Sequence, residues 1–150
     1  SAQNSHIFLS VTKEGKSAIF TSSGNENCHI ILRGGREPNF SSQFVENSSS
    51  LLCESGLIES LMIDMSHANS MKQHKKQIEV CENITEQIIS GEKRITGVMI
   101  ESNLIEGNQS DKDKNNFIYG KSITDACINW EDTKLCLNGL AKAVISRRKS

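Results

Sequence analysis

Four side chains spread along this sequence have the chemistry to hold a metal ion beside an anion. Imidazole and carboxylate groups suit manganese, iron, cobalt and zinc, so His67, Glu101 and Asp125 are candidate ligands of one divalent metal ion. Arg33 stands before two glycines. Its guanidinium offers forked donors to a phosphate or carboxylate, and glycine lets the backbone approach a ligand closely. These residue types predict a cation and an anion bound side by side.

Taken singly, each of these residues also has an ordinary structural explanation. His67 alone could be a hydrogen-bonded loop histidine, and Glu101 or Asp125 alone could be a solvated carboxylate or a helix cap. Arg33 could be an exposed residue in a turn. The chain distances between the three candidate ligands match no short metal-binding signature. A phosphate loop at Lys121 is rejected, because the glycine spacing before it is incomplete.

The predicted strands and helices support the assignment of these candidate residues, because they would position them. Three short apolar runs predict parallel strands: residues 28–32, 60–64 and 95–100. The first run is typical of a strand buried on both faces. Helices are expected after the first two runs, ending before Gly56 and Gly91. A last helix is expected over about residues 132–148. Its predicted inward face consists of Leu137, Leu140, Ala141, Val144 and Ile145.

This alternation of strands and helices predicts an α/β fold with a parallel sheet and right-handed crossovers. Three units are too few to close an eight-stranded (β/α)8 TIM barrel, which takes about 250 residues, so the chain is expected to be part of one. Active sites of such barrels form at the carboxyl ends of the strands. Arg33 follows the first predicted strand, and Asp64 and His67 follow the second. Glu101 follows the third, and Asp125 precedes the last helix.

The N-terminal segment has a different pattern. Two β-prone runs, 6–12 and 17–21, flank a turn that contains Gly15, which predicts a β-hairpin. We therefore expect a hairpin and loop over residues 1–27, followed by three strand–helix units over 28–150 in a single domain.

Composition narrows the class of protein. The chain is 36% hydrophobic and 23% charged, which suits a folded domain rather than a disordered tail. A formal net charge of -1 gives no reason to expect nucleic acid or an anionic membrane as a partner. No apolar run approaches the roughly 18 residues of a spanning helix, and no export signal is visible. The five cysteines are odd in number and form no C-x-x-C pair, which predicts small buried thiols and a cytoplasmic location.

Four longer strings resemble class I 3-deoxy-D-arabino-heptulosonate-7-phosphate (DAHP) synthases. Residues 29–35 with 38–40 resemble the phosphate-binding segment of that family. Residues 62–70 resemble its metal-histidine segment. Residues 97–104 with 106–109 resemble its metal-glutamate segment, and residues 119–127 resemble its metal-aspartate segment. The order and spacing agree over essentially the whole chain, which would make it the C-terminal part of the barrel.

The resemblance implies roles for the candidate residues. His67, Glu101 and Asp125 would be three of four metal ligands, and Arg33 would bind the phosphate of phosphoenolpyruvate. Arg33 and His67 would thus be catalytic. The enzyme would join C3 of phosphoenolpyruvate to the aldehyde of erythrose 4-phosphate, with water attacking C2 and phosphate leaving. A homo-oligomer, a dimer or a tetramer, is implied as well.

The hairpin resembles the segment that lines the aromatic amino-acid feedback site of the family. Phe8, Ser10, Val11 and Phe20 would be the effector contacts. Ordinary packing of a hairpin at an edge is an equally good explanation of these side chains.

Some features of the family are not found in this chain. Its fourth ligand is a cysteine in the N-terminal half, and none of the five cysteines here takes that position. A lysine–proline–arginine–threonine segment for the aldose phosphate is also absent. We therefore expect this chain alone to lack activity and to bind metal weakly. Two alternatives remain: a related 3-deoxy-octulosonate-8-phosphate synthase, against which the strings 66–70 and 122–127 argue, and a non-catalytic binding or assembly module.

Overall fold

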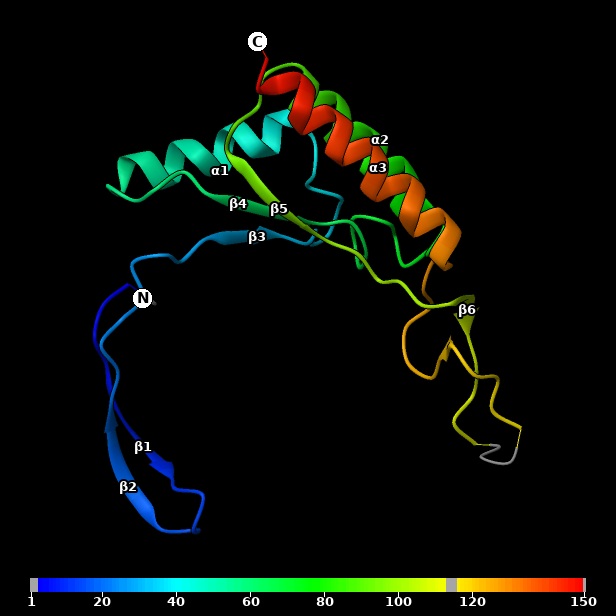
Figure 1. The fold of residues 1–150 in the computed structure, drawn as a ribbon. Coiled ribbons are helices and arrows are strands. Elements are labelled where there is room, and N and C mark those ends of the chain that lie inside the picture. The colour runs from blue at the N-terminus through cyan, green and yellow to red at the C-terminus, as the bar shows by residue number, and fades with distance from the viewer. Residues whose placement is uncertain (1–2, 113–115, 150) are drawn as a thin grey trace.

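The computed structural model describes residues 3–112 and 116–149, which form an arch with three helices on its outer side (Figure 1). A hairpin forms one arm of the arch, and the chain around β6 forms the other. The strands are β1 (Ile7–Val11), β2 (Ser17–Thr21), β3 (Ile30–Leu32), β4 (Leu61–Asp64), β5 (Ile95–Met99), β6 (Ile105–Asn108) and β7 (Lys121–Ser122). The helices are α1 (Ser42–Glu54), α2 (Lys76–Ile89) and α3 (Trp130–Arg147).

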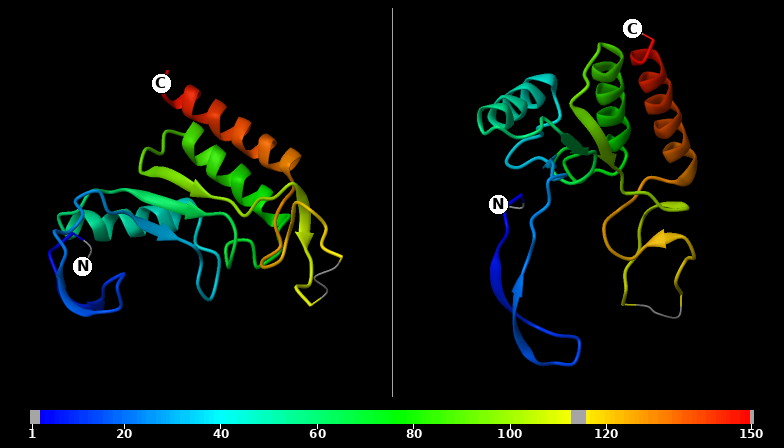
Figure 2. Two further views of the ribbon diagram at one scale, coloured as in Figure 1. Left: turned by 60° about the horizontal axis from the view of Figure 1, so that its bottom comes forward. Right: turned by 60° about the vertical axis from the view of Figure 1, so that its left-hand side comes forward.

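The centre of the arch is a parallel sheet in the order β3-β4-β5. Figure 2 shows from two further sides that α1, α2 and α3 lie together on one side of this sheet. The predicted α/β class is therefore confirmed, and the three predicted strands are present within one or two residues of their expected bounds. No closed barrel forms among the residues that the structure describes.

The hydrophobic core lies between the sheet and the helices. Leu61 and Ile63 of β4 are fully buried, as expected for the central strand. Val80, Ile84 and Ile88 of α2 recur every four residues and meet this strand from one face of the helix. The predicted stops after α1 and α2 are also found, because Gly56 and Gly91 adopt positive φ angles of 67° and 102°.

Burial of the strands on both faces was wrongly predicted for β3. Ile30 and Ile31 are 39% and 43% exposed, and only Leu32 is buried. The physical reason is that β3 is the edge strand of this sheet and that the helices cover only one of the sheet's two faces.

The last helix begins earlier than predicted, at Trp130, because Asn129 caps it. The side chain of Asn129 accepts a hydrogen bond from the backbone N–H of Asp132 at 2.8 Å. The predicted inward face is only partly correct. Leu140 and Val144 pack against the core, but Leu137, Ala141 and Ile145 are exposed. The residues buried on α3 are Thr133, Cys136 and Ala143, since only this side of the helix meets α2.

The segment between β5 and α3 is more ordered than the sequence indicated. The polar stretch 108–116 was expected to be a loop, and residues 113–115 of it lie outside the described residues. Around it, β6 pairs with β7 in parallel. Ser102 and Ile128 also form a parallel bridge, which continues the edge of the sheet beyond β5.

The predicted hairpin is present and extends away from the sheet. β1 and β2 pair antiparallel, with Phe8 opposite Phe20, and Gly15 in the turn has a φ of 79°. All five cysteines are free thiols. Burial was predicted correctly for Cys81, Cys127 and Cys136, whereas Cys28 is half-buried and Cys53 is exposed. Among the described residues, no helix is both long enough and apolar enough to cross a membrane.

Two isoleucines of α2 test the position of the core. Ile84 is fully buried, whereas Ile89 is 51% exposed on the same helix. We expect Ile84→Ala to lower the free energy of unfolding by about 2–5 kcal/mol, because it leaves a cavity. Ile89→Ala makes the same change in helix propensity and should cost less than about 1 kcal/mol. Chemical denaturation measures both values. Equal losses in the two variants would contradict the assigned core.

Candidate metal and anion site

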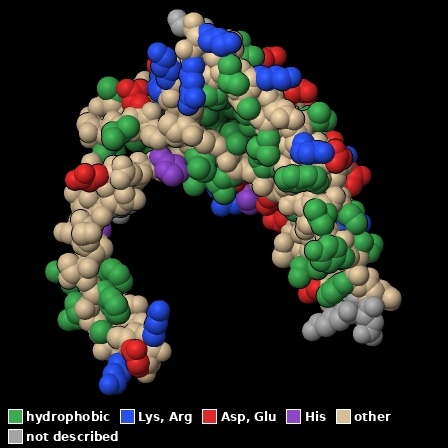
Figure 3. All heavy atoms as spheres, viewed as in Figure 1, with side chains coloured by type: hydrophobic (Ala, Val, Ile, Leu, Met, Phe, Trp, Pro, Cys, Tyr) green, Lys and Arg blue, Asp and Glu red, His purple; other side chains and the backbone are tan. Residues whose placement is uncertain are grey.

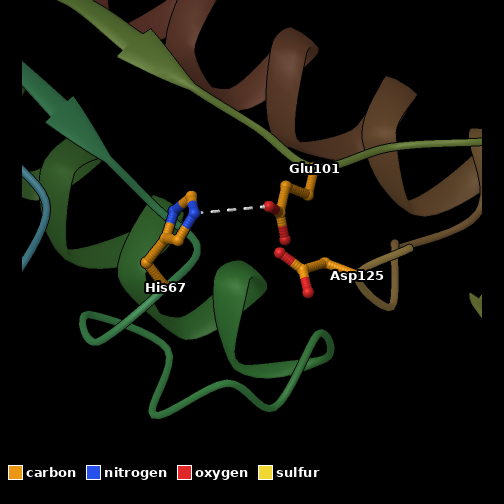
Figure 4. A group of neighbouring side chains, drawn as sticks. All are labelled: His67, Glu101 and Asp125. Atoms are coloured by element: carbon orange, nitrogen blue, oxygen red, sulfur yellow. Dashed lines mark ion pairs between the residues drawn. The ribbon is translucent and has the colours of Figure 1, made fainter.

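The structure brings His67, Glu101 and Asp125 together from three separate loops. One ligand atom from each residue lies within 4.8 Å of the other two. Figure 4 shows the imidazole and the two carboxylates directed toward a common point. His67 Nε2 is 3.7 Å from Glu101 Oε1. The spacing fits three groups arranged around one small cation.

His67 is fixed by a buried carboxylate behind it. Its Nδ1 lies 2.7 Å from Asp64 Oδ2, and Asp64 is only 1% exposed. Ser66 donates from both its backbone N–H and its hydroxyl to Asp64 Oδ1, at 2.9 and 2.6 Å. Because a carboxylate accepts hydrogen bonds, the Nδ1–H of His67 donates to Asp64, and Nε2 faces the other two groups.

The loop that carries His67 has an unusual backbone. His67, Met71 and Lys72 have positive φ values of 49°, 52° and 58°, although none of them is glycine. Backbone hydrogen bonds within the loop hold this conformation, including one from the Lys72 N–H to the His67 carbonyl at 2.8 Å. Such strain is typical of sites where the geometry serves a function.

Glu101 is held at its backbone by a fully buried glutamine. Gln77 Oε1 accepts from the Glu101 N–H at 2.9 Å, and Gln77 Nε2 donates to the Glu101 carbonyl at 3.0 Å. The N–H of Ile128 donates to the same carbonyl at 3.0 Å. Sequence reasoning missed Gln77, because a polar residue within an amphipathic helix carries no signal of the backbone group that it contacts.

The position of Asp125 depends on the short pairings around it. The bridge between Ser102 and Ile128 lies just beyond Glu101, and Gly107 bridges Cys127 from the other side. The Asp125 carboxylate is exposed, unlike the half-buried His67 and Glu101. The bridges at Cys127 and Ile128, which follow Asp125 closely, thus hold the exposed Asp125 side chain beside the end of β5.

The electrostatics of the site disfavour negative charge on Glu101. Its pKa is raised, chiefly by desolvation, and the nearby carboxylates of Asp125 and Asp64 add to the effect. His67 and Arg33 act in the opposite direction. A cation among these groups would offset the repulsion between the carboxylates.

The side chains of His67, Glu101 and Asp125 line a cavity of about 370 Å³. Arg33 and Gly34 line the same cavity, so the predicted anion group lies beside the candidate ligands. Lys72 and His74 line it too and were not predicted as site residues. Their occurrence in one short segment after His67 was the available signal. The cavity therefore has acidic and basic groups in one space.

The amides of Asn69, which is buried, and Asn39, which is half-buried, fix the Arg33–Gly34 turn. Asn69 Nδ2 donates to the carbonyls of Leu32 and Asp64, at 3.0 and 2.8 Å, which ties the ends of β3 and β4 together. Asn69 Oδ1 accepts from the Asn39 N–H, and Asn39 Oδ1 accepts from the Gly34 N–H, both at 2.7 Å. The Arg33–Gly34 turn is thus connected to the strand that leads to His67.

The four predicted effector residues lie on the hairpin and do not line this cavity. The rings of Phe8 and Phe20 stack, with centroids 5.9 Å apart and planes inclined by 16°. Side chains alternate between faces of a strand, so Ser10 shares the face of Phe8, and Val11 belongs to the opposite face. The space-filling view in Figure 3 shows this arm, with its hydrophobic side chains, standing apart from the body.

Comparisons with known proteins give a consistent result. The model of the DAHP synthetase I family matches residues 1–138. The chain is 58% identical over 143 residues to the Phe-sensitive phospho-2-dehydro-3-deoxyheptonate aldolase of Escherichia coli K12, covering 95% of this chain and 41% of that protein. It is 48% identical over 143 residues to the Trp-sensitive enzyme of Salmonella typhimurium, with the same coverage of 95% and 41%.

A solved structure agrees as well. The structure of phospho-2-dehydro-3-deoxyheptonate aldolase from Francisella tularensis SCHU S4 superposes with a TM-score of 0.92 at 48% sequence identity. The match covers 97% of this chain and 42% of that one. The chain therefore spans about two fifths of the length of these relatives.

Gly34 offers a test of the close packing at the Arg33–Gly34 turn. It has a φ of 76°, and a Cβ there would lie 2.7 Å from Ala68 Cβ and 2.9 Å from the Asn69 nitrogen. We expect Gly34→Ala to lower the free energy of unfolding by about 2–5 kcal/mol, from backbone strain and overpacking together. Gly56→Ala is the matched control, since its φ is 67° but nothing lies within 4 Å. It should cost only about 1–2 kcal/mol. Losses of the same size in both variants would show that the contact with residues 68 and 69 is unimportant.

Proposed function

Because the chain belongs to the DAHP synthetase I family, we propose that it forms the metal- and phosphate-binding part of a DAHP synthase. The complete enzyme would condense phosphoenolpyruvate with D-erythrose 4-phosphate to give 3-deoxy-D-arabino-heptulosonate 7-phosphate and phosphate. The main support is the meeting of His67, Glu101 and Asp125 with Arg33 in one cavity. The names of the relatives favour this reaction over that of the related octulosonate synthases.

In this proposal His67 Nε2 and the carboxylates of Glu101 and Asp125 hold a divalent metal ion, manganese, iron, cobalt or zinc. One imidazole and two carboxylates are a donor set that suits these ions, and the ligand atoms already lie within 4.8 Å of one another. Asp64 keeps the proton of His67 on Nδ1, and Gln77 keeps the Glu101 backbone in place. A bound ion would polarise the aldehyde oxygen of erythrose 4-phosphate as a Lewis acid.

Arg33 would bind and neutralise the phosphate of phosphoenolpyruvate, aided by the positive charge of Lys72 in the same cavity. Fixing the phosphate orients C3 of phosphoenolpyruvate toward the aldehyde carbon. A carbon–carbon bond forms between these two atoms, water adds at C2, and the C–O bond to phosphate breaks. Arg33 and His67 are thus the catalytic residues that this chain contributes.

We further infer that residues 28–150 form the last three strand–helix units of a (β/α)8 TIM barrel, preceded by the hairpin and loop of residues 1–27. The uncovered face of the sheet and the open edge of β3 support this, since a closed barrel would cover both. The remaining strands, a cysteine as fourth metal ligand and the site for the aldose phosphate would come from the rest of the enzyme. The complete enzyme would be a homo-oligomer.

The hairpin would carry feedback regulation by an aromatic amino acid. Phe8, Ser10 and Phe20 share one face of the hairpin and would contact the effector there. Val11 lies on the opposite face and would contact the effector from that side. Two of the relatives are named Phe-sensitive and Trp-sensitive. The exposed Phe8–Phe20 stack offers an aromatic surface of the kind that such a ligand prefers.

An activity assay tests the proposed reaction. We expect the complete natural enzyme to consume phosphoenolpyruvate and release phosphate only when erythrose 4-phosphate is present. Removal of divalent metal by a chelator should abolish this activity, and Mn²⁺ should restore it. The 150-residue chain alone should be inactive. His67→Ala should lower kcat by at least about 100-fold, because a ligand is lost. Full activity after chelation, or full activity in His67→Ala, would refute the proposal.

Gln77 provides a finer test. Replacing it in the complete enzyme with Met, which has a similar length and no hydrogen-bonding groups, frees the backbone of Glu101. We expect Mn²⁺ to bind about 10-fold more weakly, as is usual when a group that orients a ligand is lost. Gln87→Met is the control, since Gln87 also donates to a backbone carbonyl, but that of Phe40, which does not line the cavity. Calorimetric titration measures both affinities, and equal weakening in the two variants would contradict the role of Gln77.

A further inference from the structure

Two cysteines meet across the contact between α2 and α3, away from the candidate metal site. Cys81 on α2 and Cys136 on α3 are 3% and 4% exposed. Cys81 Sγ lies 3.7 Å from the carbonyl oxygen of Cys136, and the two thiols also form a side-chain hydrogen bond. Figures 1 and 2 show the two helices running side by side. The two cysteines are therefore neighbours across the helix contact although they are far apart in the sequence.

The pair is buried but has access to solvent. Both thiols line a cavity of about 340 Å³ between the two helices. Thr85 and Gly139 line the same cavity, and the missing side chain of Gly139 helps to keep it open. A cavity of this size has room for a molecule as small as a peroxide.

The hydrogen bonds make the two thiols unequal. Cys81 donates, so its pKa is raised, whereas the pKa of Cys136 is lowered because it accepts the hydrogen bond from Cys81. The thiolate is the nucleophilic form of cysteine. The lowered pKa favours Cys136 as the attacking group, with Cys81 as the neighbouring thiol.

We propose that Cys81 and Cys136 form a dithiol site that a peroxide oxidises to a disulfide linking α2 to α3. Cys136 Sγ attacks one peroxide oxygen, the O–O bond breaks, and one water leaves, which gives a sulfenic acid at Cys136. Cys81 Sγ then attacks this sulfur, the S–O bond breaks, and a second water leaves with the proton of Cys81. The two thiols lose two electrons in total, and the peroxide is reduced to two waters.

The bridge would connect two elements that serve the candidate metal site. Gln77, which holds the backbone of Glu101, lies one turn before Cys81 on α2. Cys136 lies on α3, which follows the segment carrying Asp125. The proposal does not rest on the proposed reaction, because it requires only the two thiols and the cavity.

Peptide mapping of the complete natural protein tests this proposal. After graded exposure to hydrogen peroxide, remaining thiols are alkylated during unfolding, and trypsin then releases residues 77–93 and 135–142, which contain one cysteine each. We expect these two peptides joined, two hydrogens lighter than their sum, at peroxide doses no higher than those that oxidise the exposed Cys53. Dithiothreitol should separate them. Recovery of both peptides in fully alkylated form at such doses would overturn the proposal.

Single variants test which thiol attacks. Cys81→Ser keeps a hydroxyl donor beside Cys136 but removes the second thiol, so the sulfenic acid should persist and dimedone should label Cys136. Cys136→Ser should leave Cys81 unlabelled at the same dose. Labelling of Cys81 in that variant, with none of Cys136 in the other, would overturn the assigned order. Cys53→Ser is the control and should leave the joined peptides unchanged.

Discussion

The parallel pairing of β4 with β5 is the constraint on which the candidate site depends. Asp64 at the end of β4 is in register with Met99 at the end of β5. The residues that follow these two strands, His67 and Glu101, must therefore leave the sheet at the same edge. Hydrogen bonding of the sheet backbone brings together groups that no short sequence signature connects.

Buried amides then convert this common edge into a defined geometry. Asn69 joins the ends of β3 and β4, and Gln77 joins α2 to Glu101, two residues after the end of β5. Both side chains are almost completely buried and have their hydrogen bonds satisfied. A buried amide of this kind is costly to leave unpaired, so each one favours a single arrangement of the loops around it.

The sequence predicted the elements better than it predicted their surroundings. The short apolar runs and the helical spacing of Ile78, Cys81, Ile84 and Ile88 identified the strands and α2, because burial imposes those periods directly. The edge position of β3 and the face of α3 that meets α2 depend on which neighbours are present, which periodicity does not encode. The candidate ligands were recognised by residue type at strand ends and by family resemblance. Gln77 and Asn69 were not recognised as supporting residues, because their partners are backbone groups distant in the sequence.

The left-handed backbone at His67, Met71 and Lys72 has a consequence for selectivity. Because hydrogen bonds within the loop and the contact with Asp64 already hold this strained shape, the metal ion proposed above would find His67 already ordered. A preorganised binding site of this kind would adapt poorly to the radius of the bound ion. Discrimination between ions of equal charge would then depend on how well each fills a nearly rigid space, rather than on how far the loop can move to meet it.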